Sequence, residues 1–247
     1  KNFEICVDGN LISKPYVDIT LKLMKLFEVN VSEKKDNIFQ VPSKQLLRNP
    51  NEINIEGDAS SASYFLAAGA IGGKVIRVNG IGSKSIQGDI QFIKILEKMG
   101  ANIKIGDNFI EVFSDKPLKS INQDLNHIPD AAMTIAILAL YAEGTSTLKN
   151  IGSWRVKETD RLAAMSNELK KLGAKVIQGE DFLQINPPLI IKSASIDTYD
   201  DHRIAMCFSL ASLNGLNKKG ANITINDSDC VSKTFPNYFD YFKKISE

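Results

Sequence analysis

Three stretches decide the fold expected for this chain: Asp58-Ala-Ser-Ser-Ala-Ser-Tyr-Phe-Leu-Ala-Ala68, Asp130-Ala-Ala-Met-Thr-Ile-Ala-Ile-Leu-Ala-Leu140 and Asp201-His-Arg-Ile-Ala-Met-Cys-Phe-Ser-Leu-Ala211. Each places an aspartate before an apolar, alanine-rich run, and the aspartates are 72 and 71 residues apart. Self-similarity at a fixed spacing indicates repeated structural units. Because an aspartate can accept hydrogen bonds from the free amides of a first helical turn, each stretch predicts the capped start of a buried helix.

Each of the first two helices is followed by the same order of elements. The pattern predicts a strand (75–78 and 146–148), a second helix, and a hairpin of two strands (102–105 with 109–112, and 175–177 with 182–185). The second helix carries an apolar stripe, which is Ile90, Ile93 and Leu96 in one copy and Leu162, Met165, Leu169 and Leu172 in the other. The unit is therefore β-α-β-α-β-β, which predicts an α/β (α+β) fold.

Incomplete copies of the unit stand at both ends. An earlier copy is visible from residue 4 to residue 41, with a helix predicted over 19–27, and the last copy has a strand at 223–225 and a helix at 238–245. The asparagine- and proline-containing segment 42–56 is the most linker-like part of the chain. We therefore predict two domains, residues 1–56 and 57–247. Because the array is incomplete and begins with a lysine, we expect other chain segments to complete it.

The composition excludes several classes of function. Thirty basic and 29 acidic residues give a net charge of +1, which argues against a nucleic-acid partner. The longest nearly apolar stretch, 131–142, is far shorter than the roughly 20 residues that cross a membrane. The three cysteines, without a CxxC pair, predict neither a disulfide framework nor a zinc site and favour a reducing compartment.

Arginine is concentrated in two short polar segments. Only five of the 30 basic residues are arginine, and Arg155, Arg161 and Arg203 lie within 153–161 and 200–203. The planar guanidinium suits two-point contacts with carboxylate and phosphate, so this clustering indicates an anion site. If the chain is helical from Val156, Lys157 and Arg161 share one face and an anion could lie between them. The alternative is a solvated first turn in which Glu158 neutralises Arg161.

Other candidate residues have structural alternatives. Asp130 follows a proline that fixes it at the helix start, so spacing alone favours a helix cap. The neighbouring Arg203 should keep His202 neutral and able to exchange protons near pH 7, although a lone histidine is more often structural. Lys233 is unremarkable by composition.

Together these segments resemble the 5-enolpyruvylshikimate-3-phosphate (EPSP) synthase family over essentially the whole chain. The matching stretches are Ser13-Lys-Pro-Tyr16, Gly57-Asp-Ala-Ser-Ser-Ala-Ser-Tyr-Phe65, Asn126-His-Ile-Pro-Asp-Ala-Ala-Met-Thr134, Trp154-Arg-Val-Lys-Glu-Thr-Asp-Arg-Leu162, Asp201-His-Arg203, Met206-Cys-Phe-Ser209 and Lys233-Thr-Phe-Pro236. The resemblance implies the enolpyruvyl transferase fold, in which two domains of β-α-β-α-β-β units close on the substrates with helix N-termini toward the cleft.

The resemblance also implies a reaction and its residues. The family transfers the enolpyruvyl group of phosphoenolpyruvate to the 5-hydroxyl of shikimate 3-phosphate, in the cytoplasm, as a step toward chorismate and the aromatic amino acids. It needs no metal or other cofactor, and the complete enzyme is expected to be a monomer. The implied catalytic residues are Asp130, Glu158 and His202. The implied contacts to shikimate 3-phosphate are Ser13, Tyr16, Asp130, Ser153 and Lys157. The implied contacts to phosphoenolpyruvate are Arg161, Arg203 and Lys233.

Two departures from the family pattern matter. The family commonly has asparagine where this chain has Ser153, and its N-terminal segment, with further anion-binding residues, is absent here. We therefore expect the 247 residues alone to fold around 57–247 but not to catalyse the reaction. The alternatives are the sister enzyme that acts on a UDP-sugar, against which the 154–161 motif argues, and a binding domain without catalysis.

Overall fold

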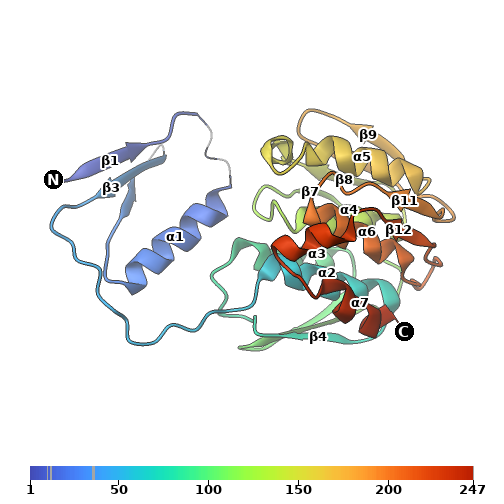
Figure 1. Cartoon of the computed structure of the whole chain (residues 1–247), viewed down its shortest axis with the longest axis horizontal. Helices are drawn as coiled ribbons and strands as arrows, with labels where there is room; N and C mark the ends of the chain where they lie inside the picture. The colour runs from blue at the N-terminus through green and yellow to red at the C-terminus, as the bar shows by residue number, and fades with distance from the viewer. Residues whose placement is uncertain (10, 12, 35–36, 247) are drawn as a thin grey trace.

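The computed structural model describes residues 1–9, 11, 13–34 and 37–246. Figure 1 shows two parts joined by an extended segment. We call residues 1–41 the N-terminal lobe, residues 42–56 the connecting segment and residues 57–246 the C-terminal lobe. The predicted division after residue 56 stays a proposal, which this arrangement supports.

Three central helices form the core of the C-terminal lobe. They are α2 (Ala59–Gly72), α4 (Ala132–Tyr141) and α6 (His202–Ser209), as the three repeated stretches predict. Every side chain of α4 is at most 1 % exposed, as expected of a helix that is apolar on all sides. The three helices also share a buried polar row, because Thr134 Oγ1 lies 2.9 Å from Ser63 Oγ and 3.7 Å from Cys207 Sγ.

The second repeat is complete and has the predicted order. It contains β7 (Asn122–Asp124), α4, β8 (Ser146–Lys149), α5 (Arg161–Lys171), β9 (Lys175–Gln178) and β10 (Leu183–Asn186). Its sheet has the order β7-β8-β10-β9, in which β7 and β8 are parallel and the other pairs antiparallel. The predicted stripe of α5 and its following turn is fully buried: Leu162, Met165, Leu169 and Leu172.

The first and third repeats are partial within the described residues. The first contains α2, β4 (Ile76–Asn79), the 3-10 turn η2 (Gly88–Gln91), α3 (Phe92–Lys98), β5 (Asn102–Ile105) and β6 (Phe109–Phe113), with the sheet order β4-β6-β5. The third pairs β11 (Ala194–Ile196) in parallel with β12 (Ile223–Ile225) around α6. It continues through the 3-10 turns η4 (Leu210–Ser212) and η5 (Ser228–Lys233) and ends with α7 (Tyr238–Ser246).

The predicted stripe of the first repeat's second helix is confirmed in part, because Leu96 is fully buried and Ile90 and Ile93 pack against the core. Phe92, Ile95 and Leu96 are the buried residues of α3, whereas Ile90 and Ile93 are only partly buried. Ile90 lies in η2, and a 3-10 turn has three residues per turn rather than 3.6. Ile90 therefore lies in the turn before α3 and not in the helix itself.

The N-terminal lobe is a small antiparallel sheet with one helix. Its elements are β1 (Phe3–Cys6), α1 (Lys14–Leu26), β2 (Ser32–Lys34) and β3 (Ile38–Val41), and its sheet order is β1-β3-β2. The helix begins at Lys14, earlier than the predicted residue 19, because Pro15 suits the first turn of a helix.

No described helix is both long and apolar enough to cross a membrane.

Candidate active site

Asp130 is the centre of a network of charged side chains, not a helix cap. Helix α4 begins at Ala132 with Ala131 at the cap position, so the cap interpretation of Asp130 is wrong. Its carboxylate instead accepts hydrogen bonds from Arg161 Nη1 at 2.8 Å and from the hydroxyl of Tyr16, and pairs with Arg203 Nη2 at 3.1 Å. Residues from the N-terminal lobe, the second repeat and the third repeat thus meet at one carboxylate.

The two equivalent aspartates do cap their helices, as predicted. Asp58 accepts from the amides of Ser60 and Ser61, each at 3.1 Å. Asp201 accepts from the amide of Arg203 at 2.9 Å. The three aspartates thus occupy equivalent places in the repeats but differ in their contacts.

Arg161 joins three carboxylates in the interior. Its side chain is 1 % exposed. Besides Asp130, it donates from Nε to Asp201 Oδ2 at 2.7 Å and from Nη2 to Glu158 Oε2 at 2.5 Å. Asp201 therefore both caps α6 and holds Arg161, a second role that the sequence pattern did not predict.

The segment before Arg161 is not the predicted helix. A 3-10 turn, η3, covers Gly152–Val156, and α5 begins only at Arg161, where the carboxylate of Asp160 accepts from Ala163 N at 3.0 Å. Trp154 is buried and donates to Pro129 O at 2.7 Å, which ties the 3-10 turn to the start of the α4 region. Helix geometry therefore does not place Lys157 beside Arg161.

Lys157 nevertheless reaches the same carboxylate. Its Nζ lies 4.0 Å from Asp130 Oδ1 and 5.6 Å from the centre of the Tyr16 ring, within range of a cation–π interaction. The two cations that the sequence predicts on one helix face thus lie in a loop and at a helix terminus, and both are near Asp130.

Glu158 lies between two cations. Arg161 contacts one of its oxygens, and Lys233 Nζ lies 2.8 Å from the other. Burial favours the protonated form, but Lys233 and Arg161 together outweigh it and lower the pKa of Glu158 to about 2. Glu158 is therefore ionised at neutral pH in this structure.

His202 is buried at the start of α6 and is 1 % exposed. Its Nδ1 lies 3.9 Å from Asp201 Oδ1, and neither ring nitrogen has a hydrogen-bond partner among the described residues. Burial and then the neighbouring Arg203 lower the pKa of His202, which agrees with the predicted neutral imidazole.

Two predicted residues are not joined to this network. Ser13 immediately precedes α1 in a left-handed conformation, and its side chain does not cap that helix. Ser153 is buried in the 3-10 turn next to Trp154. Among the described residues, neither hydroxyl makes a hydrogen bond to the cluster around Asp130, so their predicted contacts to substrate remain predictions.

Asp89 is a buried carboxylate that the sequence pattern did not single out. It accepts from the hydroxyl of Ser60, while its Oδ1 has no partner among the described residues. A small cavity of about 100 Å³ beside it is also lined by Tyr16 and Arg203. Burial, the largest effect, raises the pKa of Asp89 to about 6, with a further rise from the negative charge of Asp130.

We predict that Asp89→Asn stabilises the protein at pH 7.5. The folded-state pKa lies above its ordinary value of 3.8, so the stabilising contribution of this group is present below pH 4 and is lost as the pH rises through 6. The variant should gain roughly 2 to 3 kcal/mol at pH 7.5, measured by urea unfolding, and almost nothing near pH 4. The exposed Asp229→Asn is the control, and an equal gain at both pH values for Asp89→Asn would contradict this account.

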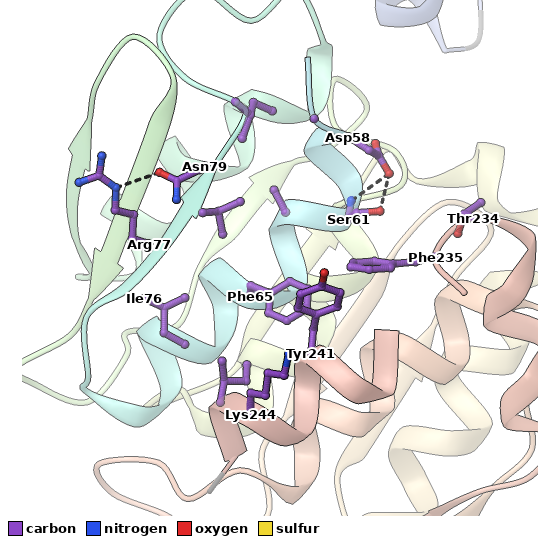
Figure 2. A pocket seen from close by; sticks show the side chains of 15 residues that line it. Asp58, Ser61, Phe65, Ile76, Arg77, Asn79, Thr234, Phe235, Tyr241 and Lys244 are labelled. Carbon is purple, nitrogen blue, oxygen red and sulfur yellow. Dashed lines mark hydrogen bonds between the residues drawn. The ribbon is translucent and has the colours of Figure 1, made fainter. Parts of the chain in front are cut away.

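A larger groove shares Asp58 with the small cavity beside Asp89 but is not lined by Asp130 or by the cations that contact Asp130. It has a volume of about 590 Å³ and lies between α2, β4 and α7. Figure 2 shows Phe65, Phe235 and Tyr241 around it, with Asp58 bonded to Ser61 at one end. Because its lining is mainly apolar and lacks the predicted catalytic side chains, we place the candidate site at Asp130 and not here.

The comparisons with known proteins agree with the resemblance seen in the sequence. The model of the family described as EPSP synthase (3-phosphoshikimate 1-carboxyvinyltransferase) matches residues 1–242. This chain belongs to the EPSP synthase family. The 3-phosphoshikimate 1-carboxyvinyltransferase of Herminiimonas arsenicoxydans is 60% identical over 98% of this chain and 55% of its own length. That of Buchnera aphidicola subsp. Acyrthosiphon pisum (strain 5A) is 56% identical over 100% of this chain and 56% of its own length.

Two solved structures show the same fold. An EPSP synthase from Acinetobacter baumannii matches with a TM-score of 0.78 and 26% identity, over 99% of this chain and 57% of that one. The enolpyruvyl transferase NikO from Streptomyces tendae matches with a TM-score of 0.73 at 16% identity, over 99% of this chain and 55% of that one, and supports the fold alone. The enolpyruvyl transferase fold predicted from the sequence is thus confirmed. The chain spans about half the length of the relatives it matches.

Proposed function

We propose that the protein transfers the enolpyruvyl group of phosphoenolpyruvate to the 5-hydroxyl of shikimate 3-phosphate and releases phosphate, as a step toward chorismate and the aromatic amino acids. Membership of the EPSP synthase family supports this. The observation that carries the proposal is the meeting of Tyr16, Arg161 and Arg203 on the carboxylate of Asp130. Three parts of the chain thereby present a buried base and fixed cations to one place.

The cations suit two anionic substrates. We assign Arg161, Arg203 and Lys233 to the carboxylate and phosphate of phosphoenolpyruvate. Arginine can grip such groups with two parallel hydrogen bonds. We assign Lys157 and Tyr16, together with Ser13 and Ser153, to shikimate 3-phosphate. The first pair already lies against Asp130, which supports their inclusion in one subsite.

Asp130 suits the role of base. The neighbouring Arg203 and Arg161 outweigh the effect of burial and lower the pKa of Asp130, so its carboxylate is ionised at neutral pH. It would accept the proton of the 5-hydroxyl as that oxygen bonds to the central carbon of phosphoenolpyruvate. The methylene carbon gains a proton in the same addition, which gives a tetrahedral ketal. The neutral His202 would support the movement of protons.

Glu158 suits the role of general acid, but only when substrate is bound. Its pKa of about 2 reflects Lys233 and Arg161, which are also the cations assigned to phosphoenolpyruvate. When the substrate's negative groups bind these cations, their hold on Glu158 weakens and its pKa rises. Glu158 can then deliver a proton to the methylene carbon. It would take a proton back from the methyl group as phosphate leaves, which restores the enolpyruvyl double bond.

The partners and the location follow from the same proposal. The two small-molecule substrates are the expected partners, with no nucleic acid or membrane, and the complete enzyme would act as a monomer. A cytoplasmic location is supported by the cysteines, since all three are free thiols in the described structure.

A phosphate-release assay tests the proposed function. The protein that contains this chain should release phosphate only when phosphoenolpyruvate and shikimate 3-phosphate are both present. A UDP-sugar acceptor should not replace shikimate 3-phosphate, and turnover with that acceptor alone would favour the sister enzyme. No turnover with either acceptor would overturn the proposal. Residues 1–247 alone form a second arm, in which we expect no turnover because catalysis needs both substrates clamped in place.

A further inference from the structure

The turn that precedes α6 has an unusual backbone. Tyr199 and Asp200 both have positive φ values, 56° and 55°, immediately before Asp201. L-residues other than glycine are uncommon in this left-handed region, and a bulky side chain such as tyrosine is an outlier there. Two such residues in succession persist only where the surrounding structure holds them.

Glu168 holds this turn from α5. Its side chain is fully buried. One of its oxygens accepts from the hydroxyl of Tyr199 at 2.8 Å, and the other accepts from the amide of Asp197 at 3.1 Å. Lys171 Nζ, at 2.7 Å, compensates its charge. The carboxylate thus binds both the backbone and a side chain of the segment that enters the turn.

The same helix holds the other end of the turn. Arg161, the first residue of α5, binds Asp201 at 2.7 Å. Arg161 and Glu168 are seven residues apart, which is close to two helical turns and places them on one face of α5. A single rigid helix therefore clamps the segment 197–201 at two points, and the left-handed residues lie between them.

We propose that Glu168 and Tyr199 are positioning residues of the candidate active site. They hold the turn so that Asp201 meets Arg161 and so that His202 and Arg203 begin α6 beside it. Neither residue contacts Asp130, so their effect on catalysis passes through the Asp201–Arg161 pair. This inference rests on the proposed function, because that function assigns Arg161 to the binding of phosphoenolpyruvate.

The kinetic test is Tyr199→Phe, which removes only the hydroxyl. If the turn loosens, Arg161 loses its fixed place, and misplacement of a binding group by even about 1 Å can cost on the order of 10² in rate. We expect KM for phosphoenolpyruvate to rise about tenfold while KM for shikimate 3-phosphate changes less than about twofold. Glu168→Gln should act in the same direction. Tyr241→Phe, at an exposed tyrosine of α7, should leave both values unchanged.

A rescue variant separates positioning from general stability. Glycine adopts the left-handed conformation without steric cost, so Asp200→Gly should reduce the backbone strain that the contacts of Glu168 and Tyr199 offset. Added to Tyr199→Phe, it should restore most of the lost affinity for phosphoenolpyruvate. Unchanged KM values in an active Tyr199→Phe protein would overturn the positioning role and leave the proposed function intact.

A second readout does not depend on activity. In urea unfolding, the effects of Tyr199→Phe and Arg161→Lys should be non-additive, because both act on the same segment. Tyr241→Phe and Arg161→Lys should be additive. Additive effects of Tyr199→Phe and Arg161→Lys would overturn the positioning role, whether or not the protein releases phosphate. A lack of phosphate release by the wild-type protein would, by itself, overturn only the proposed function.

Discussion

Glu158→Gln should lower the turnover of the proposed reaction by roughly 10² to 10⁴ while leaving the affinity for shikimate 3-phosphate nearly unchanged. Glutamine keeps the size of the side chain and one acceptor oxygen, which can accept from either Lys233 or Arg161, the two cations that contact separate oxygens of Glu158 in this structure. It cannot carry the proton that the methylene carbon must gain and lose. Turnover would be measured by phosphate release and shikimate 3-phosphate binding by calorimetry.

A matched variant shows whether this effect belongs to the site. Glu180→Gln makes the same change at an exposed glutamate of the same repeat and should leave turnover unaltered. Thermal unfolding of both variants checks that the site variant is folded. A fall of only a few-fold for Glu158→Gln would remove Glu158 from the proton transfer and leave it as a partner of the cations.

The fold was largely predictable because its main signals are local and repeated. An aspartate before an alanine-rich run predicts a capped, buried helix, and three such runs at one spacing predict three equivalent helices. The structure confirms these helices as α2, α4 and α6, although Asp130 does not cap α4. The apolar stripe of α3 was confirmed only in part. Leu96 is buried as predicted, but Ile90 lies in a 3-10 turn, which apolar spacing does not distinguish from an α-helix, and the buried Phe92 and Ile95 were missed.

The site was only partly predictable, because its contacts join distant segments. The clustering of arginines indicated an anion site, and Arg161 and Arg203 do meet. Nothing near Asp130 in the sequence shows that its carboxylate turns away from its helix toward cations of other repeats. Asp89 and Glu168 were missed for the same reason. Their burial and partners depend on packing between elements, which residue spacing within one element does not report.

The resemblance supplied what spacing could not. Lys157 and Arg161 were predicted to share a helix face, but η3 ends at Val156 and α5 starts at Arg161. Both nevertheless reach Asp130, and their implied binding of substrate stays a prediction. The family pattern therefore grouped two residues that lie near one carboxylate, whereas the helical periodicity on which the anion argument depended is absent between them.

Arg161→Met should destabilise the C-terminal lobe by about 3 to 5 kcal/mol, because it leaves the buried carboxylate of Asp201 without a cation and removes one of the cations that bind Asp130. Methionine fills a similar volume, so the loss would come from charge more than from packing. Asp201 is fully buried and Asp130 nearly so, and both contact this guanidinium at 2.8 Å or less. Urea unfolding at pH 7.5 would measure the change in the free energy of unfolding.

Arg155→Met is the control, because it removes the same group from the same segment. Arg155 also donates to a carboxylate, Asp160 at 2.9 Å, and to two backbone carbonyls, but 35% of its side chain is exposed. Water can replace those contacts, so we expect a loss of about 1 kcal/mol or less. The cost of Arg161→Met should also shrink as the pH falls, because Arg161, with Arg203, lowers the pKa of Asp130 against the effect of burial, and this contribution to stability is lost once the carboxylate is protonated. Equal losses for the two arginines, or a loss at Arg161 that does not change with pH, would show that packing and not the buried charge of Arg161 stabilises this site.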